Sequence, residues 1–226
     1  MPPSALPALS AIHAWIDRAG RHLVAVAPDL GHLVDDYTGE ARFGATAIAD
    51  DLSRVRIGAR VLEVGAGAGL LSAALQAAGY RVTALEPVGA GFSHMARLRA
   101  LVDDYAGAQG VDLERLDIGA EALATGPVFD LVFSINVMEH VDDVGAVLHG
   151  VWAALAPGAS YRFVCPNYRF PYEPHFGLPT LGGKALTWRV FQRRILGSSV
   201  VVDPAGTWAS LNWISVTQVR RLCRRE

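Results

Sequence analysis

Residues 61–75, which read VLEVGAGAGLLSAAL, constrain the fold of this chain more than any other stretch. A short apolar run leads directly into glycines at positions 65, 67 and 69, and an apolar, helix-forming segment follows. Such a run is typical of a strand that is buried on both faces of a parallel sheet, and the glycines permit a tight turn with close backbone approach. The pattern predicts a strand, a turn and a helix, with a ligand lying across the turn at the carboxyl end of the strand.

Apolar periodicity predicts further elements on both sides of this unit. We expect helices at 5–27, 41–55, 92–105 and 142–155, and a loop at 35–39. Further strands are expected at 82–85, 111–116, 129–135 and 161–165. Because strands and helices alternate, the sequence predicts an α/β fold with a Rossmann-like, doubly wound, mostly parallel sheet and right-handed crossovers.

Length and charge narrow the function classes. The 226 residues suit one α/β domain, and 51% of them are hydrophobic, which is ample material for a core. The net charge is −2, but residues 181–226 carry eight Lys and Arg against two acids. This basic C-terminal region predicts peripheral contact with an anionic membrane surface, or alternatively only a solvated helix face. Nucleic acid is not expected as a partner, because the whole-chain balance is slightly acidic.

The cysteine pattern and the N-terminal residues indicate the cellular compartment in which the protein is expected. The two cysteines, Cys165 and Cys223, have no metal-ligand or CxxC spacing. The N-terminal residues have helical apolar spacing and no basic leader, so they do not read as a signal peptide. Both observations predict a cytoplasmic protein.

The acid and the glycines of the first unit point to a family. Glu63 stands two residues before Gly65, and this order resembles the first motif of class I S-adenosylmethionine-dependent methyltransferases. The rival is a dinucleotide-binding turn, which requires G-x-G-x-x-G spacing, but its third position here is Leu70. Glu86 ends the next apolar segment, and both classes use such an acid on ribose hydroxyls, so it does not discriminate. An NAD-dependent oxidoreductase therefore stays the alternative.

The resemblance covers about residues 35–168 and implies a cofactor site for S-adenosyl-L-methionine, with S-adenosyl-L-homocysteine as product. It places the methionine end of the cofactor at the first turn and at the turn after the fourth strand. The ribose is expected at the acid after the second strand, and the adenine at an acid and an apolar residue after the third strand. A loosely matching aromatic residue near the cofactor is Tyr37. The residues that this assigns to the cofactor are Glu63, Gly65, Ala66, Gly67, Glu86, Pro87, Asp117, Ile118, Asn136 and Val137.

Two histidines are candidate catalytic bases. Residues 138–141 read MEHV, similar to the Glu-His-Val turn of small-molecule members such as quinone-biosynthesis methyltransferases. His140 is the obvious base for removing a proton from the acceptor, although Glu139 and His140 are equally able to fix the turn by hydrogen bonds. His175 is the second candidate base.

A dense loop after the fifth strand is the expected rim of the substrate pocket. Residues 166–177 read PNYRFPYEPHFG and combine prolines, aromatic rings and titratable groups. We assign substrate contacts to Tyr168, Tyr172, Glu173 and His175; the alternative is a rigid loop that packs on the sheet. No metal site is predicted, because Glu173 and His175 supply only two ligands.

Three regions complete the expected organisation: a helical cap at 1–57, a cofactor-binding core at 58–168, and a substrate lid with a C-terminal helix at 169–226. Ser215 begins a capping box for that last helix. Family members usually add two final strands, and here only residues 200–202 offer one, so the last strands are expected to be missing. The resulting open edge predicts pairing with a second copy as a homodimer.

The sequence therefore predicts methyl transfer from S-adenosylmethionine to an oxygen, nitrogen or carbon nucleophile of a small-molecule or lipid-like acceptor. The alternatives are the oxidoreductase and a non-catalytic partner subunit with the methyltransferase fold.

Overall fold

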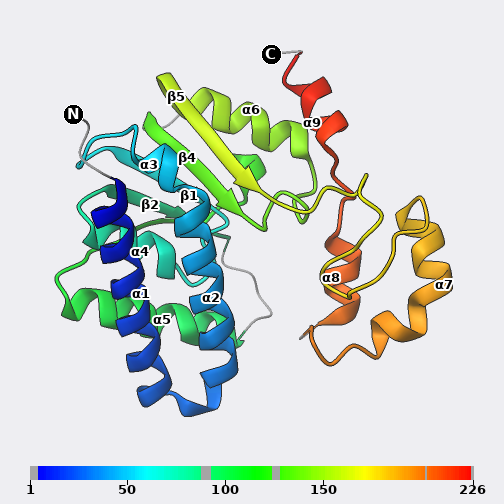
Figure 1. Ribbon diagram of the computed structural model, residues 1–226, viewed down its shortest axis with the longest axis horizontal. Helices are drawn as coiled ribbons and strands as arrows, with labels where there is room; N and C mark the ends of the chain where they lie inside the picture. The colour runs from blue at the N-terminus through cyan, green and yellow to red at the C-terminus, as the bar shows by residue number, and fades with distance from the viewer. Residues whose placement is uncertain (1–4, 88–92, 124–127, 202, 225–226) are drawn as a thin grey trace.

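The computed structural model describes residues 5–87, 93–123, 128–201 and 203–224. Its centre is a sheet of five strands, in which every neighbouring pair is parallel (Figure 1). The strand order is β3-β2-β1-β4-β5. The strands are β1 Arg60–Val64, β2 Arg81–Leu85, β3 Glu114–Leu116, β4 Phe129–Ile135 and β5 Leu155–Val164. This arrangement confirms the predicted Rossmann-like α/β fold, and the order reverses between β1 and β4, where such sheets bind ligands.

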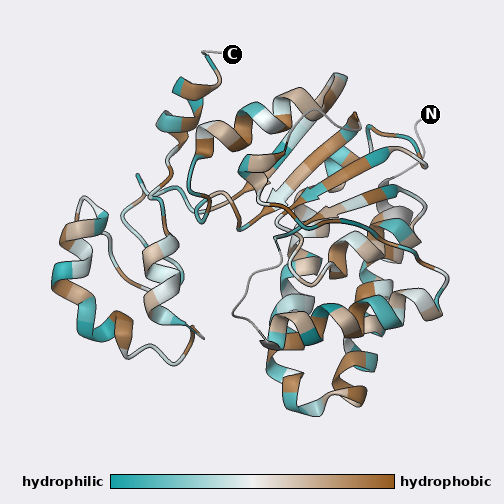
Figure 2. Ribbon diagram, turned by 180° about the vertical axis from the view of Figure 1, so that it is seen from behind, coloured by the Kyte–Doolittle hydropathy of each residue, from teal (hydrophilic) through white to brown (hydrophobic). Residues whose placement is uncertain are grey.

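Helices cover both faces of the sheet. The first layer holds α1, α2, α4 and α5, and the second holds α6. The helices are α1 Ala5–Val26, α2 Gly31–Ala47, α3 Ala49–Leu52, α4 Leu70–Ala77, α5 Ser93–Ala108, α6 Val144–Ala154, α7 Lys184–Leu196, α8 Pro204–Ser210 and α9 Val216–Leu222, with 3-10 turns at Pro28–Leu30 and Ala120–Ala122. Val61 of β1 packs into the first layer and Leu62 into the second, so the strand is buried on both faces as its apolar run predicts. The same burial explains the apolar colour of the central strands in Figure 2.

The structure corrects the predicted loop at 35–39, because these residues lie inside α2. Val34, Ala41 and Ala45 fall on one helical face and are buried, whereas Asp35 and Asp36 point to solvent. The polar residues that suggested a loop are thus the exposed face of an amphipathic helix. The predicted helix at 41–55 is in fact the end of α2 followed by the short α3.

Strand boundaries also differ from prediction at the sheet edges. The edge strand β3 covers only Glu114–Leu116 of the predicted 111–116. The other edge strand, β5, begins at Leu155 and ends at Val164, so it starts well before the predicted range of 161–165 and contains Pro157 and Gly158. Phe129 pairs with Leu155 and Leu131 pairs with Ser160, so the intervening residues form an irregularity. An edge strand tolerates proline there because one side needs no partner.

The C-terminal part stands beside the main body and is formed by α7, α8 and the loop after β5 (Figure 1). Val200 and Val201 form no strand, and residue 202 lies outside the described residues. Within the described part of the chain, the sheet ends at β5. The Ser215 side chain accepts a hydrogen bond from the backbone N–H of Gln218, which confirms the predicted cap of α9. None of the described helices combines the length and the apolar character that a bilayer span requires.

Candidate functional site

The glycine-rich turn after β1 has the conformation that its composition predicts. Gly65, Gly67 and Gly69 all have positive φ, at 75°, 54° and 84°, a region that residues with a Cβ rarely occupy. The N–H groups of Gly65 and Ala66 donate to the carbonyl oxygen of Leu85 at 2.8 and 3.0 Å. The turn is therefore tied to the end of β2, and its far side is free to line a groove.

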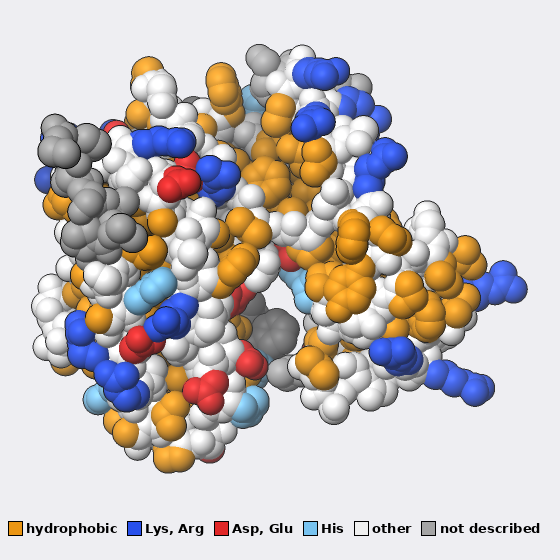
Figure 3. All heavy atoms as spheres, viewed as in Figure 1, with side chains coloured by type: hydrophobic (Ala, Val, Ile, Leu, Met, Phe, Trp, Pro, Cys, Tyr) orange, Lys and Arg blue, Asp and Glu red, His pale blue; other side chains and the backbone are white. Residues whose placement is uncertain are grey.

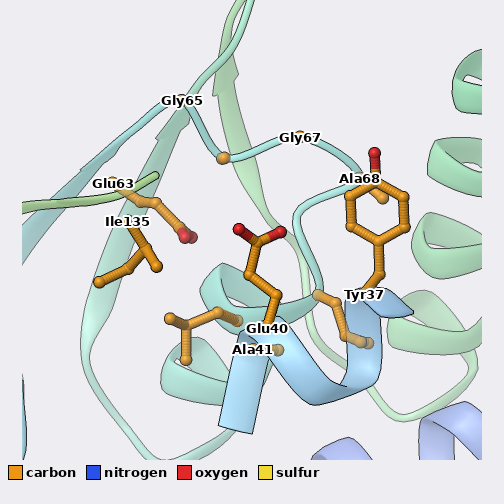
Figure 4. Close-up of a pocket in the computed structure, with 11 residues that line it drawn as sticks. Tyr37, Glu40, Ala41, Glu63, Gly65, Gly67, Ala68 and Ile135 are labelled. Atoms are coloured by element: carbon orange, nitrogen blue, oxygen red, sulfur yellow. The ribbon is translucent and has the colours of Figure 1, made fainter. Parts of the chain in front are cut away.

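That groove has a volume of about 410 Å³ and lies at the carboxyl ends of β1, β2 and β4. A smaller recess of about 50 Å³ adjoins it beneath the glycine-rich turn, and Figure 4 shows Tyr37 and Glu40 projecting from α2 toward that turn. Residues from the predicted cofactor set that line the groove or the recess are Glu63, Gly65, Ala66, Gly67, Glu86, Pro87, Asn136 and Val137.

Glu86 is fixed against the turn. Its Oε2 accepts a hydrogen bond from the N–H of Gly67 at 3.0 Å. Burial raises the pKa of this carboxyl, while the hydrogen bond from Gly67 opposes the rise. The acid after β2 therefore stands at the groove wall, where the family places the contact with the ribose.

Glu63 lies at the bottom of the recess. It is 5% exposed, and the hydroxyl of Ser72 on α4 donates a hydrogen bond to its Oε2. Burial raises the pKa of Glu63 to about 8. Burial of this carboxyl favours its protonated form, in which it carries one O–H donor while Oε2 accepts from Ser72.

The turn after β4 closes the groove on its other side. Asn136 has a φ of 53°, and its Nδ2 donates to Oε1 of Glu40 at 2.8 Å. Val137 stands so close to Gly65 that a Cβ at position 65 would overlap its side chain. Sequence reasoning missed Glu40, because nothing local to α2 indicates that it meets a turn so far along the chain.

Asp117 and Ile118, assigned to the adenine, do not line the groove. Asp117 accepts a hydrogen bond from Arg99 at 2.6 Å and is half exposed, and Ile118 is 36% exposed. The groove wall in this region continues instead with Gly119, Ala120 and Glu121. The assignment of the adenine to Asp117 and Ile118 stays a prediction.

His140 and His175 meet although they are far apart in the sequence. Their ring centroids are 5.2 Å apart in an edge-to-face arrangement, and His140 also lines the groove. The segment after α8 holds the turn of His140 in place: Asn212 donates from Nδ2 to the carbonyl oxygens of Met138 and Val141, both at 2.8 Å. Burial, assisted by the neighbouring His175, lowers the pKa of His140 to about 4.

The loop after β5 orients His175. Glu173 is fully buried and accepts hydrogen bonds from His175 Nδ1 at 2.6 Å and from the N–H of Phe176 at 2.8 Å. The hydroxyl of Tyr168 donates to the same carboxylate at 3.3 Å, and the Tyr168 ring stacks on Trp213. Tyr168 and Glu173 therefore support His175 from inside the protein and do not line the groove, whereas Tyr172 is 47% exposed at the surface.

Figure 3 shows the molecule hollowed between the main body and the part formed by α7 and α8.

Trp208 of α8 packs edge-to-face on Phe176 and Trp213, and stacks on Trp188 of α7. Three of the tryptophans thus serve to fasten α7 and α8 to the loop that carries His175.

Comparison with known proteins agrees with this geometry. A family model of the methyltransferase domain matches residues 62–161. An uncharacterized protein of Mycobacterium tuberculosis is 43% identical over 222 residues, which cover 96% of this chain and 75% of that protein. A ubiquinone biosynthesis O-methyltransferase of Pseudomonas fluorescens is 34% identical over 166 residues, which cover 72% of this chain and 67% of that enzyme.

Solved structures show the same fold at low sequence identity. Phosphoethanolamine N-methyltransferase 2 of Haemonchus contortus, solved in complex with S-adenosyl-L-methionine, matches with a TM-score of 0.55 at 15% identity. The match covers 80% of this chain and 35% of that one. The YcgJ protein of Bacillus subtilis matches with a TM-score of 0.52 at 16% identity, over 77% of this chain and 64% of that one. The chain belongs to the class I S-adenosylmethionine-dependent methyltransferases.

Proposed function

We propose that this protein transfers the methyl group of S-adenosyl-L-methionine to an oxygen of a small, partly apolar acceptor molecule. The observation that carries the proposal is the continuity of the groove, which runs from the glycine-rich turn past Glu86 and Asn136 to His140. One end suits the cofactor and the other end holds groups that act on an acceptor.

The residues present fit the cofactor. Gly65 and Gly67 line the groove without side chains, so a ligand can approach their backbone closely. Glu86 offers a carboxylate that can accept hydrogen bonds from two adjacent ribose hydroxyls. Asn136 and the recess at Glu63 stand near the turn, where they would hold the polar methionine end. The sulfonium supplies an already activated methyl group.

The acceptor end is built to orient a nucleophile and to exclude water. His140 and Val141 line the groove there, and the loop after β5 brings His175 against His140. Imidazole groups promote the loss of a proton from a hydroxyl acceptor. The buried aromatic side chains of Trp208 and Phe176 pack near His175 and would exclude water from the acceptor end of the groove.

Oxygen is favoured as the acceptor atom by the relatives. The Pseudomonas fluorescens enzyme, 67% of which aligns with this chain, is a ubiquinone biosynthesis O-methyltransferase. That name describes the relative, and it motivates phenols and hydroxyquinols as the first acceptors to test here.

The test is a transfer assay with S-adenosylmethionine that carries a deuterated methyl group. Catechols, hydroxyquinols and simple phenols are offered in parallel with primary amines, and products are identified by mass spectrometry. We expect label on an oxygen of one phenolic class, with S-adenosylhomocysteine formed in equal amount. Label only on amines would overturn the choice of oxygen. Hydride exchange with NAD, or cofactor binding without any turnover, would favour the oxidoreductase or the non-catalytic subunit instead.

A further inference from the structure

Glu139, His140 and His175 form a cluster that methyl transfer alone does not explain. Each offers one ligand atom, and the three atoms lie within 4.8 Å of one another. Over the described ranges of the chain, it is the one group of three or more such side chains so close together. The cluster combines two turns from distant parts of the sequence, since His175 comes from the loop after β5.

The hydrogen bonds around His140 fix which of its nitrogens is free. Nδ1 of His140 lies 2.7 Å from the hydroxyl oxygen of Ser210. The single hydroxyl hydrogen of Ser210 is donated to the carbonyl oxygen of Thr207 at 2.9 Å. Ser210 must therefore accept from His140, so the proton of the neutral ring sits on Nδ1 and the lone pair is on Nε2.

The same reasoning applies to His175. Its Nδ1 lies 2.6 Å from Oε1 of Glu173, and a carboxylate can only accept, so Nδ1 is the donor. The Nε2 of the neutral ring again carries the lone pair. Histidines that bind metals almost always donate their other N–H to a carboxylate, a carbonyl oxygen or a similar acceptor, and both rings here are held in that way.

The burial of the Glu139 carboxyl is a third observation about this cluster. It is fully buried, and neither of its carboxylate oxygens has a hydrogen-bond partner. Leaving a buried acceptor without a partner costs about 1–3 kcal/mol, and more if it is charged. An unpartnered carboxylate beside two imidazoles, with one ligand atom of each residue within 4.8 Å of the others, is a set that a cation would satisfy.

We infer that Glu139, His140 and His175 bind a divalent transition-metal ion. Two imidazoles and one carboxylate suit zinc, cobalt or iron(II) better than magnesium or calcium, which prefer oxygen ligands. Ligand atoms of a tetrahedral zinc ion lie roughly 3.4 Å apart for bonds of about 2.1 Å. The three atoms lie within 4.8 Å of one another, so the cluster would contract when an ion binds. The site goes beyond the sequence prediction of no metal, because only the fold brings Glu139 and His140 to His175.

The location of the site suggests its role. His140 lines the acceptor end of the groove, so a hydroxyl or carboxylate oxygen of the acceptor would coordinate an ion held there. A ring whose Nε2 binds the metal has no lone pair for a proton, so with the ion present the ion, rather than an imidazole, would promote ionisation of the acceptor hydroxyl. This part of the inference rests on the proposed function, whereas metal binding itself does not.

The test is a titration of the full chain, freed of any affinity tag and of metal, with Co²⁺ followed by visible absorption and with Zn²⁺ followed by calorimetry. We expect one ion per chain and, for Co²⁺, the absorption bands of a low-symmetry site. His175→Gln and Glu139→Gln should each weaken Zn²⁺ binding by at least about 100-fold, and Glu173→Gln, which removes only the orienting carboxylate, by about 10- to 100-fold. The matched control is His32→Ala, which removes an exposed histidine on α2.

Far-UV circular dichroism of the same samples shows whether each variant is folded, and binding of S-adenosylhomocysteine tests the proposed function separately. Metal binding that is absent from the wild type, or that persists undiminished in His175→Gln, would overturn the inference even if S-adenosylhomocysteine binds. Metal binding without S-adenosylhomocysteine binding would instead leave the metal site standing and reject the methyltransferase role.

Discussion

The backbone N–H of Asn212 donates a hydrogen bond to the carbonyl oxygen of Glu139 at 2.8 Å. With the two bonds from its side chain to Met138 and Val141, Asn212 holds the whole turn after β4 from the segment between α8 and α9. The C-terminal part of the chain thus shapes the acceptor end of the groove without lining it.

Asn212→Ala should therefore destabilise the protein. The change removes the two N–H donors of the Asn212 side chain, so the carbonyl oxygens of Met138 and Val141 lose these hydrogen bonds. The loss should cost about 1–3 kcal/mol. Asn212→Asp keeps the size and the acceptor for the N–H of Ile214 but should also destabilise, since it lacks the donors. Urea unfolding measures both, with exposed Gln109→Ala as control. An Asn212→Ala variant as stable as the control would show that the turn does not depend on these bonds.

Gly65→Ala should cost more stability than Gly58→Ala. Both glycines have positive φ, at 75° and 83°, but a Cβ at position 58 would meet open space, whereas one at position 65 would overlap Val137. The backbone conformation accounts for about 1–2 kcal/mol at either site, and the overlap adds roughly 1–3 kcal/mol at Gly65 alone. Thermal unfolding of the two variants provides the comparison. Adding Val137→Ala to Gly65→Ala should recover part of the loss; equal costs at the two glycines would contradict the packing described.

Glu63 should make the protein less stable as the pH rises. Its pKa is raised by burial to about 8 in the folded state, above the value of about 4.3 in an unfolded chain. Between these values the folded protein holds a proton that the unfolded chain has lost, so the contribution of Glu63 is fully present below about pH 4.3 and is lost as the pH rises toward 8.

Glu63→Gln tests this dependence, because the amide oxygen can still accept from Ser72 and cannot ionise. Melting temperatures between pH 5 and 8.5 should fall less steeply for the variant than for the wild type. Burial also raises the pKa values of Glu40 and Glu86, so the melting temperature of the Glu63→Gln variant should still fall somewhat as the pH rises. Parallel curves for wild type and variant would mean that Glu63 is not buried as described.

The sequence predicts secondary structure best where adjacent residues determine it. The unit of β1, the glycine turn and α4 follows from adjacent residues, and β4 matches its predicted range of 129–135 because a continuous apolar run leaves little choice. The loop predicted at 35–39 is wrong because the polar residues of α2 form its exposed face, and only packing on α1 shows which face is buried.

Contacts between distant segments could not be predicted. Glu40 meets Asn136, and His140 meets His175, only because the sheet order sets β4 beside β1 and β5. Periodicity indicates which side chains are buried, but it does not say which distant loop covers them. Glu173 illustrates the point: a residue expected to touch the substrate is instead a buried support for His175.

The affinity of the groove for S-adenosylhomocysteine tests the proposed function most directly, and calorimetry measures it. The wild type should bind this product, and Glu86→Ala should bind it at least about 10-fold more weakly, a loss of about 1.4 kcal/mol. Asp104→Ala, which removes an exposed acid from α5, should bind like the wild type, and NAD should give no heat. Failure to bind S-adenosylhomocysteine, equal binding by Glu86→Ala, or binding of NAD would contradict the assignment of this groove to the methyl donor.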